Sequence, residues 1–177
     1  NYIYNKKKNL TVTLGGYDYK KNSLKILSII PYLEKFKKIN FISGNKKDFN
    51  ILKKKISKFK KIKLYYRPKN ILKILFDSKL VIVSGGITLF ECILMNIPTV
   101  ALPQYNHQLK TIRNLSKYKL TILGSNKMGI LRKKLINKII YSNFKDYKFS
   151  NKKLFSLDCN GLKRISQYIS KIIDGKI

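Results

Sequence analysis

The sequence predicts an α/β fold in which a Rossmann-like parallel sheet carries helices on both faces. Strand and helix signals alternate along the chain, which is typical of repeated β-α units. The expected strands are too short and too apolar for a two-sheet sandwich, and glycine pairs follow two of them. Because crossover connections are right-handed, such units build one parallel sheet. No internal repeat or long linker interrupts the pattern, so residues 1–177 are read as a single domain.

The strands are runs of β-branched and other apolar residues that end at glycine or proline. The first, NLTVTL, ends in a glycine pair; Gly44 ends the second and Pro68 closes the third. The fourth, LVIVS, is apolar throughout, as expected for a strand that is buried on both faces. The expected strands are residues 9–14, 39–43, 62–66, 80–84, 99–103 and 120–124.

Helical patterns fill the intervals between these strands. Leu24, Leu27 and Ile30 share one face of an expected helix over 23–36. Asp48 is expected to cap the next helix, which runs to about residue 59. The other expected helices are residues 70–78, 87–96, 107–119, 127–141 and, at the C-terminus, 160–173, while residues 1–8 are read as a linker.

Lysine dominates the charge of the chain. Thirty-five of the 39 basic side chains are lysine, and only eight residues are acidic, which gives a formal net charge of +31. Such a charge is typical of proteins that bind nucleic acid or an anionic membrane. However, surfaces that read bases or fork phosphates favour arginine, and the lysines are spread along the whole chain among Ile, Asn, Tyr and Phe. We therefore expect compositional drift from AT-rich coding and no specific nucleic-acid partner. A lysine-rich nucleic-acid-binding protein and a peripheral contact with an anionic membrane remain as alternatives.

The sequence shows no sign of membrane insertion or of a bound metal. It has no run of about eighteen apolar residues, and its start lacks the apolar stretch of a signal peptide. Cys92 and Cys159 lie far apart and form no metal-binding spacing. We expect two free thiols in a reduced, cytoplasmic protein without a metal or another cofactor.

One stretch of the chain, residues 80–109, contains no lysine at all. Glu91 is its only formally charged residue, and His107 is the only histidine of the protein. If lysine has drifted into every surface position that tolerates it, the positions that exclude lysine are the informative ones.

Two glycine pairs, Gly15–Gly16 and Gly85–Gly86, follow the first and fourth expected strands. In parallel sheets, ligands bind beyond the carboxyl ends of the strands. A glycine pair followed by a helix lets the backbone approach a ligand and presents free N–H groups at the positive helix end, which suits phosphate. The alternative is a tight strand-to-helix turn with glycine at positive φ and no ligand.

Glu91 and His107, both in the lysine-free stretch, each have two interpretations. Thr88 and Glu91 match a capping box, yet Glu91 could instead accept hydrogen bonds from a ribose diol, as acidic residues do in other nucleotide-binding folds. His107, with Gln108 beside it, opens an expected helix and could face the same cleft. A lone histidine at a helix start is more often a surface or capping residue.

Several stretches together resemble a known family. TLGGYD, VSGGITLFECILMNIPTVALPQYNHQ and LDCNGLKRI occur in the expected order. They are similar to the C-terminal, nucleotide-binding half of GT-B-fold enzymes that act on UDP-sugars. The resemblance is in particular to the UDP-sugar hydrolases of pseudaminic acid biosynthesis and the related spore-coat polysaccharide proteins, and more distantly to lipid-II-forming N-acetylglucosaminyltransferases. The pattern formed by Asp158, Gly161, Arg164 and Ile165 resembles the hydrolase branch.

The resemblance implies which residues would hold the phosphates. Gly15 and Gly16 would line the diphosphate and sugar side of the cleft. Gly85, Gly86 and Thr88 would present N–H and hydroxyl groups to the phosphates.

The resemblance also implies contacts to the other parts of the ligand. Glu91 would hold the ribose hydroxyls, and the loop at Tyr66 and Arg67 would flank the uracil through backbone atoms. Gln108 would reach the sugar or the phosphates. The family usually has asparagine directly before this glutamine, whereas His107 intervenes here.

The resemblance implies the nucleotide-binding half of an enzyme without its catalytic half. In the hydrolase family, a glycine-rich loop of the N-terminal half carries the histidine that activates water, and no such loop precedes Gly15 here. Apart from Glu91, the acidic residues are isolated among lysines and offer no carboxylate pair. We therefore expect a UDP-sugar ligand, no catalytic residue in this chain, no activity of the chain alone, and an N-terminal GT-B domain as partner in cis or in trans. The expected enzyme is a UDP-sugar hydrolase that releases UDP in surface-polysaccharide or nonulosonate synthesis; the alternative is an N-acetylglucosaminyltransferase-like glycosyltransferase.

Overall fold

The computed structural model describes residues 8–118, 121–124 and 160–174. The expected helix over 127–141 and residues Asp158 and Cys159 lie outside the described residues. The described strands are β1 (Asn9–Thr13), β2 (Lys38–Ser43), β3 (Ile62–Tyr66), β4 (Ser78–Val83), β5 (Thr99–Ala101) and β6 (Ile122–Leu123). The described helices are α2 (Asn22–Leu27), the 3-10 helix η1 (Ile30–Tyr32), α3 (Lys46–Ile56), α4 (Ile71–Phe76), α5 (Ile87–Leu94), α6 (Asn106–Lys117) and α8 (Gly161–Ile173).

The strands form one parallel sheet in the order β3-β2-β1-β4-β5-β6. The chain builds outwards from β1 through β2 and β3, and then returns to the other side of β1 for β4. Thr13 therefore pairs with Ile42 on one side and with Val83 on the other. This confirms the predicted α/β parallel sheet, and it makes the β1–β4 junction the topological switch point.

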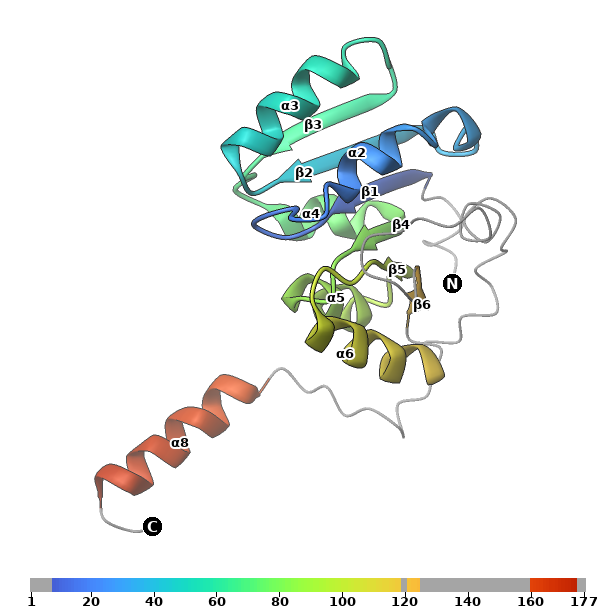
Figure 1. Ribbon diagram of the computed structural model, residues 1–177. Helices are drawn as coiled ribbons and strands as arrows, with labels where there is room; N and C mark the ends of the chain where they lie inside the picture. Colours follow the sequence, from blue (N-terminus) through green and yellow to red (C-terminus); the bar gives the residue numbers. More distant parts are fainter. Residues whose placement is uncertain (1–7, 119–120, 125–159, 175–177) are drawn as a thin grey trace.

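Helices cover both faces of the sheet, as Figure 1 shows. On one face, Ile26 of α2 and Leu52 of α3 belong to a core cluster with side chains of β1 and β2. On the other face, Leu89 of α5 and Ile112 of α6 belong to a second cluster, which also includes a side chain of α4. The sheet is thus the middle layer of three, which confirms the expected arrangement.

Strand β4 is buried on both of its faces. Leu80 and Ile82 join the first cluster, whereas Val81 and Val83 join the second, and all four are 0% exposed. Successive strand residues point to opposite faces, so an unbroken apolar run is what this central position requires. The interpretation of LVIVS as a strand buried on both faces is confirmed.

The expected helix over 23–36 is wrong in its second half. Helix α2 ends at Leu27, and the chain continues as η1, which has Pro31 in its first turn. Proline has no N–H to donate, and its ring clashes with the carbonyl four residues earlier, here that of Leu27. Leu33 and Phe36 are nevertheless buried in the first cluster. The apolar pattern identified the buried side chains although the helix is interrupted.

Asp48 is not the cap of α3, which corrects another expectation. The cap is Asn45, whose side-chain oxygen accepts hydrogen bonds from the N–H groups of Lys47 (2.8 Å) and Asp48 (3.2 Å). Asparagine and aspartate are about equally good caps, so the two candidates, three residues apart, could not be ranked by residue type. Asp48 lies in the first turn, where the helix dipole favours a carboxylate.

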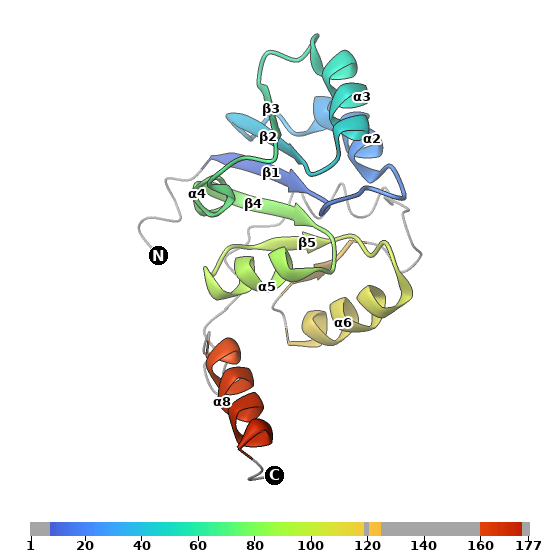
Figure 2. The same cartoon turned by 90° about the vertical axis from the view of Figure 1, so that its left-hand side faces the viewer.

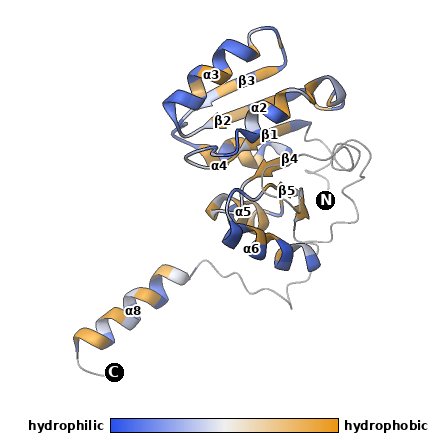
Figure 3. Ribbon diagram, in the orientation of Figure 1, coloured by the Kyte–Doolittle hydropathy of each residue, from blue (hydrophilic) through white to orange (hydrophobic). Residues whose placement is uncertain are grey.

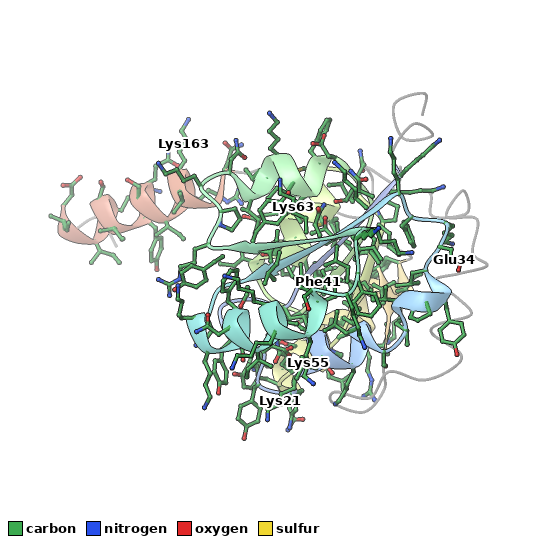
Figure 4. All side chains as sticks on the ribbon, turned by 90° about the horizontal axis from the view of Figure 1, so that it is seen from above. Lys21, Glu34, Phe41, Lys55, Lys63 and Lys163 are labelled. Atoms are coloured by element: carbon green, nitrogen blue, oxygen red, sulfur yellow. The ribbon has the colours of Figure 1, made fainter. Side chains whose placement is uncertain are left out.

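The lysines are spread over the surface of the fold. None of those in the described residues is buried. Figure 4 labels Lys21, Lys55, Lys63 and Lys163, which are exposed and belong to different parts of the fold, whereas Phe41 lies in the core. The charge is therefore not gathered on a single element.

Helix α8 has one apolar and one polar side, which Figure 3 shows by colour. None of its residues is buried. Its exposed apolar residues are Leu162, Ile165, Tyr168, Ile169, Ile172 and Ile173. Across the described ranges, no helix combines the length and the apolar character that crossing a membrane would require.

A buried hydroxyl network joins β1, β2 and β4. Thr11 Oγ1 accepts a hydrogen bond from Asn40 Nδ2 at 3.2 Å and lies 2.7 Å from Ser78 Oγ. Ser78 Oγ in turn donates to the carbonyl oxygen of Ile74 at 2.8 Å, so the proton between the two hydroxyls belongs to Thr11. The network fixes the three strands next to the switch point.

Replacing Thr11 by valine should lower the free energy of unfolding by about 1–3 kcal/mol, because the buried amide of Asn40 loses its acceptor. Thr11→Ser keeps the hydroxyl and should retain more stability than Thr11→Val. Urea unfolding of both variants measures the difference. A Thr11→Val protein as stable as the parent would show that the network contributes nothing.

Candidate functional site

The candidate site lies at the carboxyl ends of the strands. In Figure 2 the strand arrows of β1, β4 and β5 point to one edge of the sheet, and the loops that follow them lie together at that edge. The glycine pairs predicted from the sequence follow β1 and β4, the two strands of the switch point. Ligands of open parallel sheets bind at this place because the two loops diverge there.

The loop after β1 is shaped by glycine. Gly15 has φ = +87°, a conformation that side chains other than that of glycine rarely adopt. Gly44, which follows β2, packs so closely that a Cβ atom on it would lie 2.7 Å from Gly16 Cα and 3.1 Å from Gly15 O. The loops after β1 and β2 therefore touch backbone to backbone, which the sequence alone did not indicate.

Asp18 turns this loop into α2. Its carboxylate accepts hydrogen bonds from the N–H groups of Asn22 (2.9 Å) and Ser23 (2.7 Å), and its side chain is buried. Asp48 Oδ2 accepts a hydrogen bond from Asp18 N at 3.3 Å, and both residues line one small pocket with Lys21. The expectation that these acids are isolated is wrong. Their described hydrogen bonds are to backbone N–H groups that shape the loop, which fits a structural role.

The loop after β4 leads directly into α5. Gly86 is the N-cap, and the first amide of the helix with a backbone acceptor is that of Leu89, bonded to Gly86 O at 3.1 Å. Within the described part of the chain, the N–H groups of Gly86, Ile87 and Thr88 have no acceptor. Unpaired N–H groups at a helix start attract anions, helped by the helix dipole.

Gly85 allows α6 to pack against this loop. A Cβ atom on it would lie 2.7 Å from Gln108 Cβ and 3.0 Å from Ile112 Cδ1. By contrast, the nearest atom to a Cβ on Gly86 would be Ser84 Oγ, at 3.8 Å. The two glycines thus have different structural roles: Gly85 makes room for α6, and Gly86 leaves the start of α5 open.

Thr88 and Glu91 do not form a capping box. Thr88 is the second residue of α5, whose N-cap is Gly86, so the threonine is not where a capping box needs it. Glu91 is half-buried in the second turn, and among the described residues its carboxylate has no hydrogen-bond or ion-pair partner. The structure therefore excludes the capping interpretation and leaves this carboxylate free for a ligand.

The neighbouring Cys92 is a buried thiol on the same helix. Burial raises its pKa to about 12, and the negative charge of Glu91 contributes in the same direction. A thiol with so high a pKa remains protonated at neutral pH and is a poor nucleophile. Cys92 belongs to the second core cluster.

Tyr66 and Arg67 lie at the end of β3, beside the loop after β2. Arg67 has φ = +41°, its N–H bonds to Ser43 O at 3.2 Å, and its Nε donates to Gly44 O at 2.9 Å. The ring of Tyr66 has Lys46 Nζ at 5.0 Å and Arg67 Cζ at 5.6 Å from its centroid. The backbone of this loop is thus fixed, and the tyrosine ring is already engaged by cations.

A buried glutamine that sequence reasoning missed connects the loops after β1 and β5. Gln104, which is 2% exposed, donates from Nε2 to Leu14 O at 2.6 Å and to Tyr17 O at 3.3 Å. Its backbone N–H donates to Gln108 Oε1 at 2.9 Å. Gln108 is itself buried, so the structure uses its side-chain oxygen within the protein. The only signal for Gln104 was a polar residue in the lysine-free stretch directly after a strand.

The exposed rim of these two loops is aromatic. Tyr19, on the loop after β1, stacks on Tyr105 with ring centroids 6.5 Å apart. Tyr105 stacks on His107 with a separation of 5.7 Å and an interplanar angle of 5°. His107 lies at the start of α6, where the sequence pattern placed it, and its side chain is exposed. Among the residues that the structure describes, no three potential metal ligands cluster.

Replacing Gly85 by alanine should lower the free energy of unfolding by about 1–3 kcal/mol, because the new methyl group collides with α6. Gly86→Ala meets no atom closer than 3.8 Å, so only the poorer N-cap preference of alanine should count, which costs about 0.5–1 kcal/mol. Thermal unfolding of the matched pair measures both effects. Equal stability of the two variants would contradict the packing role of Gly85.

Comparison with known proteins supports a distant relationship. No protein-family model matches the chain. A stretch of 101 residues is 34% identical to the uncharacterized protein MJ1062 of Methanocaldococcus jannaschii. This match covers 55% of this chain and 21% of that protein. A stretch of 112 residues is 27% identical to the spore coat polysaccharide biosynthesis protein SpsG of Bacillus subtilis. This match covers 62% of this chain and 33% of that protein. The matches thus span between about a fifth and a third of the length of these relatives, and the chain is distantly similar to a polysaccharide biosynthesis protein.

Proposed function

We propose that this chain binds a UDP-sugar at the β1–β4 switch point and is the nucleotide-binding part of an enzyme of surface-polysaccharide synthesis. The observation that carries the proposal is the start of α5. There, Gly86, Ile87 and Thr88 present N–H groups without acceptors at the switch point of a parallel sheet. The name of the relative from Bacillus subtilis, a spore coat polysaccharide biosynthesis protein, supports the same class of process.

Backbone amides supply the positive potential for the diphosphate in this proposal. A helix start binds phosphate without a lysine because its N–H groups and dipole already attract an anion. The open space at Gly86 lets a phosphate oxygen approach the backbone closely. The Gly15–Gly16 loop faces the same edge from β1 and would close the diphosphate site.

Glu91 is the proposed ribose ligand. Its carboxylate is half-buried on α5, the helix whose start would hold the phosphates, and it has no partner in the described part of the protein. A carboxylate in this position can accept two hydrogen bonds from a ribose diol. The fixed backbone at Tyr66 and Arg67 would hold the uracil on the β3 side of the phosphates.

The proposed enzyme is a UDP-sugar hydrolase, and a glycosyltransferase is the alternative. Both reactions would release UDP from the same cleft, the first with water and the second with a sugar acceptor as nucleophile. Among the described residues we assign no catalytic group: Cys92 is buried with a raised pKa, and the carboxylates of Asp18 and Asp48 accept hydrogen bonds from backbone N–H groups. An N-terminal domain, in cis or in trans, would supply the catalytic group.

The proposal predicts that affinity rises with the number of phosphates. Calorimetry should show tighter binding of UDP than of UMP, and tighter binding of UMP than of uridine, because each phosphate adds charge-assisted hydrogen bonds to backbone N–H groups. CMP should bind more weakly than UDP. In a spectrum with assigned backbone amides, UDP should shift Gly86 and Thr88. Binding that shifts neither residue would place the ligand elsewhere and contradict the proposal.

Replacing Glu91 by alanine should weaken UDP binding by about 1–3 kcal/mol, the value of hydrogen bonds to a charged group. The loss should be smaller for 2′-deoxy-UDP, which already lacks one of the hydroxyl groups. The matched control is Glu34→Ala, since Glu34 is the only other glutamate, is exposed, and precedes β2, at the opposite edge of the sheet from the carboxyl ends of the strands. A Glu91→Ala protein that loses equal affinity for UDP and 2′-deoxy-UDP would show that the carboxylate does not bind that hydroxyl.

A further inference from the structure

Three aromatic side chains form an exposed row beside the candidate site, which we call the aromatic row: Tyr19, Tyr105 and His107. The two tyrosines are 59% and 45% exposed, and His107 is exposed as well. The rings are nearly parallel, with interplanar angles of 23° and 5° between neighbours. Large aromatic side chains that gather at the surface are more often part of a binding surface than single exposed ones.

The rings in the row are farther apart than rings in direct face-to-face contact, so part of each face is uncovered. Their centroids are 6.5 and 5.7 Å apart, whereas rings lying directly over one another would be separated by about the thickness of a ring, roughly 3.5–4 Å. Offset stacking is the favoured arrangement of aromatic pairs. The aromatic row therefore presents an extended surface of ring faces and edges.

The buried side chain of Gln104 fixes the loops that carry the row. Gln104 lies directly before Tyr105 and is hydrogen-bonded to Leu14 O, on the loop that leads to Tyr19. It also accepts a hydrogen bond from Lys20 N at 3.5 Å, at the residue after Tyr19. A surface that is ordered before binding costs little conformational entropy when a ligand arrives. The row is thus a preorganised surface.

The position of the row relates it to the proposed ligand. Gly85, on the loop after β4, packs against Gln108, which is the residue after His107. The aromatic row therefore lies next to the loop after β4. At the opposite side of the sheet edge, the ring of Tyr66 already has Lys46, Arg67 and Phe49 around it. In the row, Tyr19 also has a cation, Lys20 Nζ, at 5.0 Å from its centroid and the ring of Tyr17 at 6.4 Å. Among the described residues Tyr105 and His107 have ring contacts only, so these two rings are the more open to a ligand ring.

We propose that the aromatic row is the contact surface for the sugar ring of the bound nucleotide-sugar, an inference that rests on the proposed function. A pyranose ring has apolar faces of C–H groups, which match the electron-rich face of an aromatic ring. Tyrosine supplies such a face together with a hydroxyl that can bond to the sugar. The side chain of Gln108 is buried and its oxygen accepts a hydrogen bond from Gln104 N. In this proposal Tyr105 and His107 therefore contact the sugar in its place. The row adds affinity for the sugar without adding affinity for UDP.

His107 provides a direct test because it is the only histidine in the chain. Its imidazole C–H protons give isolated signals in a proton spectrum of the full chain. We expect UDP-N-acetylglucosamine to shift these signals, and UDP at equal saturation to leave them nearly unchanged. Both ligands should shift the amide of Gly86.

Variants of Tyr105 measure what the row contributes to binding. Tyr105→Ala should weaken binding of UDP-N-acetylglucosamine about two- to tenfold and leave UDP affinity unchanged, whereas Tyr105→Phe should retain most of the affinity. Tyr32→Ala is the matched control, because Tyr32 is 63% exposed and lies on η1. A parallel Tyr19→Ala variant should show the same selective loss.

The possible failures can be told apart. If UDP shifts Gly86 but UDP-N-acetylglucosamine leaves His107 unchanged, the inference about the row is overturned and the proposed function stands. If Tyr105→Ala weakens UDP and UDP-N-acetylglucosamine equally, the row contacts the nucleotide and the inference is also overturned. If neither ligand binds, both proposals are overturned.

Discussion

The pairing of β1 with β4 is the constraint on which the rest of the structure depends. The chain first builds outwards through β2 and β3, and it must then return to the opposite side of β1. At this junction the strand-to-helix loops of two neighbouring strands, β1 and β4, run in opposite directions, and both contain a glycine pair. The apolar run of β4 suits this place, because its residues are buried alternately in the clusters on the two faces of the sheet.

Around this junction, the loops are held by close backbone contacts and by buried amide groups. Missing Cβ atoms let Gly44 touch Gly16 and let Gly85 touch α6. Buried amides then hold the loops: Gln104 connects the loop after β1 to the loop after β5, and Gln108 holds Gln104. This arrangement gives a rigid edge whose free groups are helix-start N–H groups and one carboxylate, a combination that suits an anionic ligand with hydroxyl groups.

The same structure explains why lysine is absent from residues 80–109. More than half of these residues are buried, in β4, α5 and β5, in the loops that join these elements, and at the start of α6, and a buried ammonium group would lose its hydration. Burial does not account for the exposed positions of the stretch, which are Ile87, Leu94, Asn96, Tyr105, Asn106 and His107. Packing thus explains the absence of lysine at the buried positions alone.

The sequence by itself determined the alternation of strands and helices, the parallel sheet, the strand buried on both faces, and the position of the glycine pairs at strand ends. These features follow from local periodicity and from residues with special backbone freedom, which can be read within a short window. Two further features also depend on nearby residues, but the sequence offered competing signals for them. The apolar pattern continues past Pro31, where the helix is interrupted, and Asp48 is as good a capping residue as Asn45. Only the tertiary structure decided which loops touch. Gln104 bonds to Leu14, 90 residues away, and Tyr105 stacks on Tyr19, because contacts between distant residues depend on strand order, which no local pattern encodes.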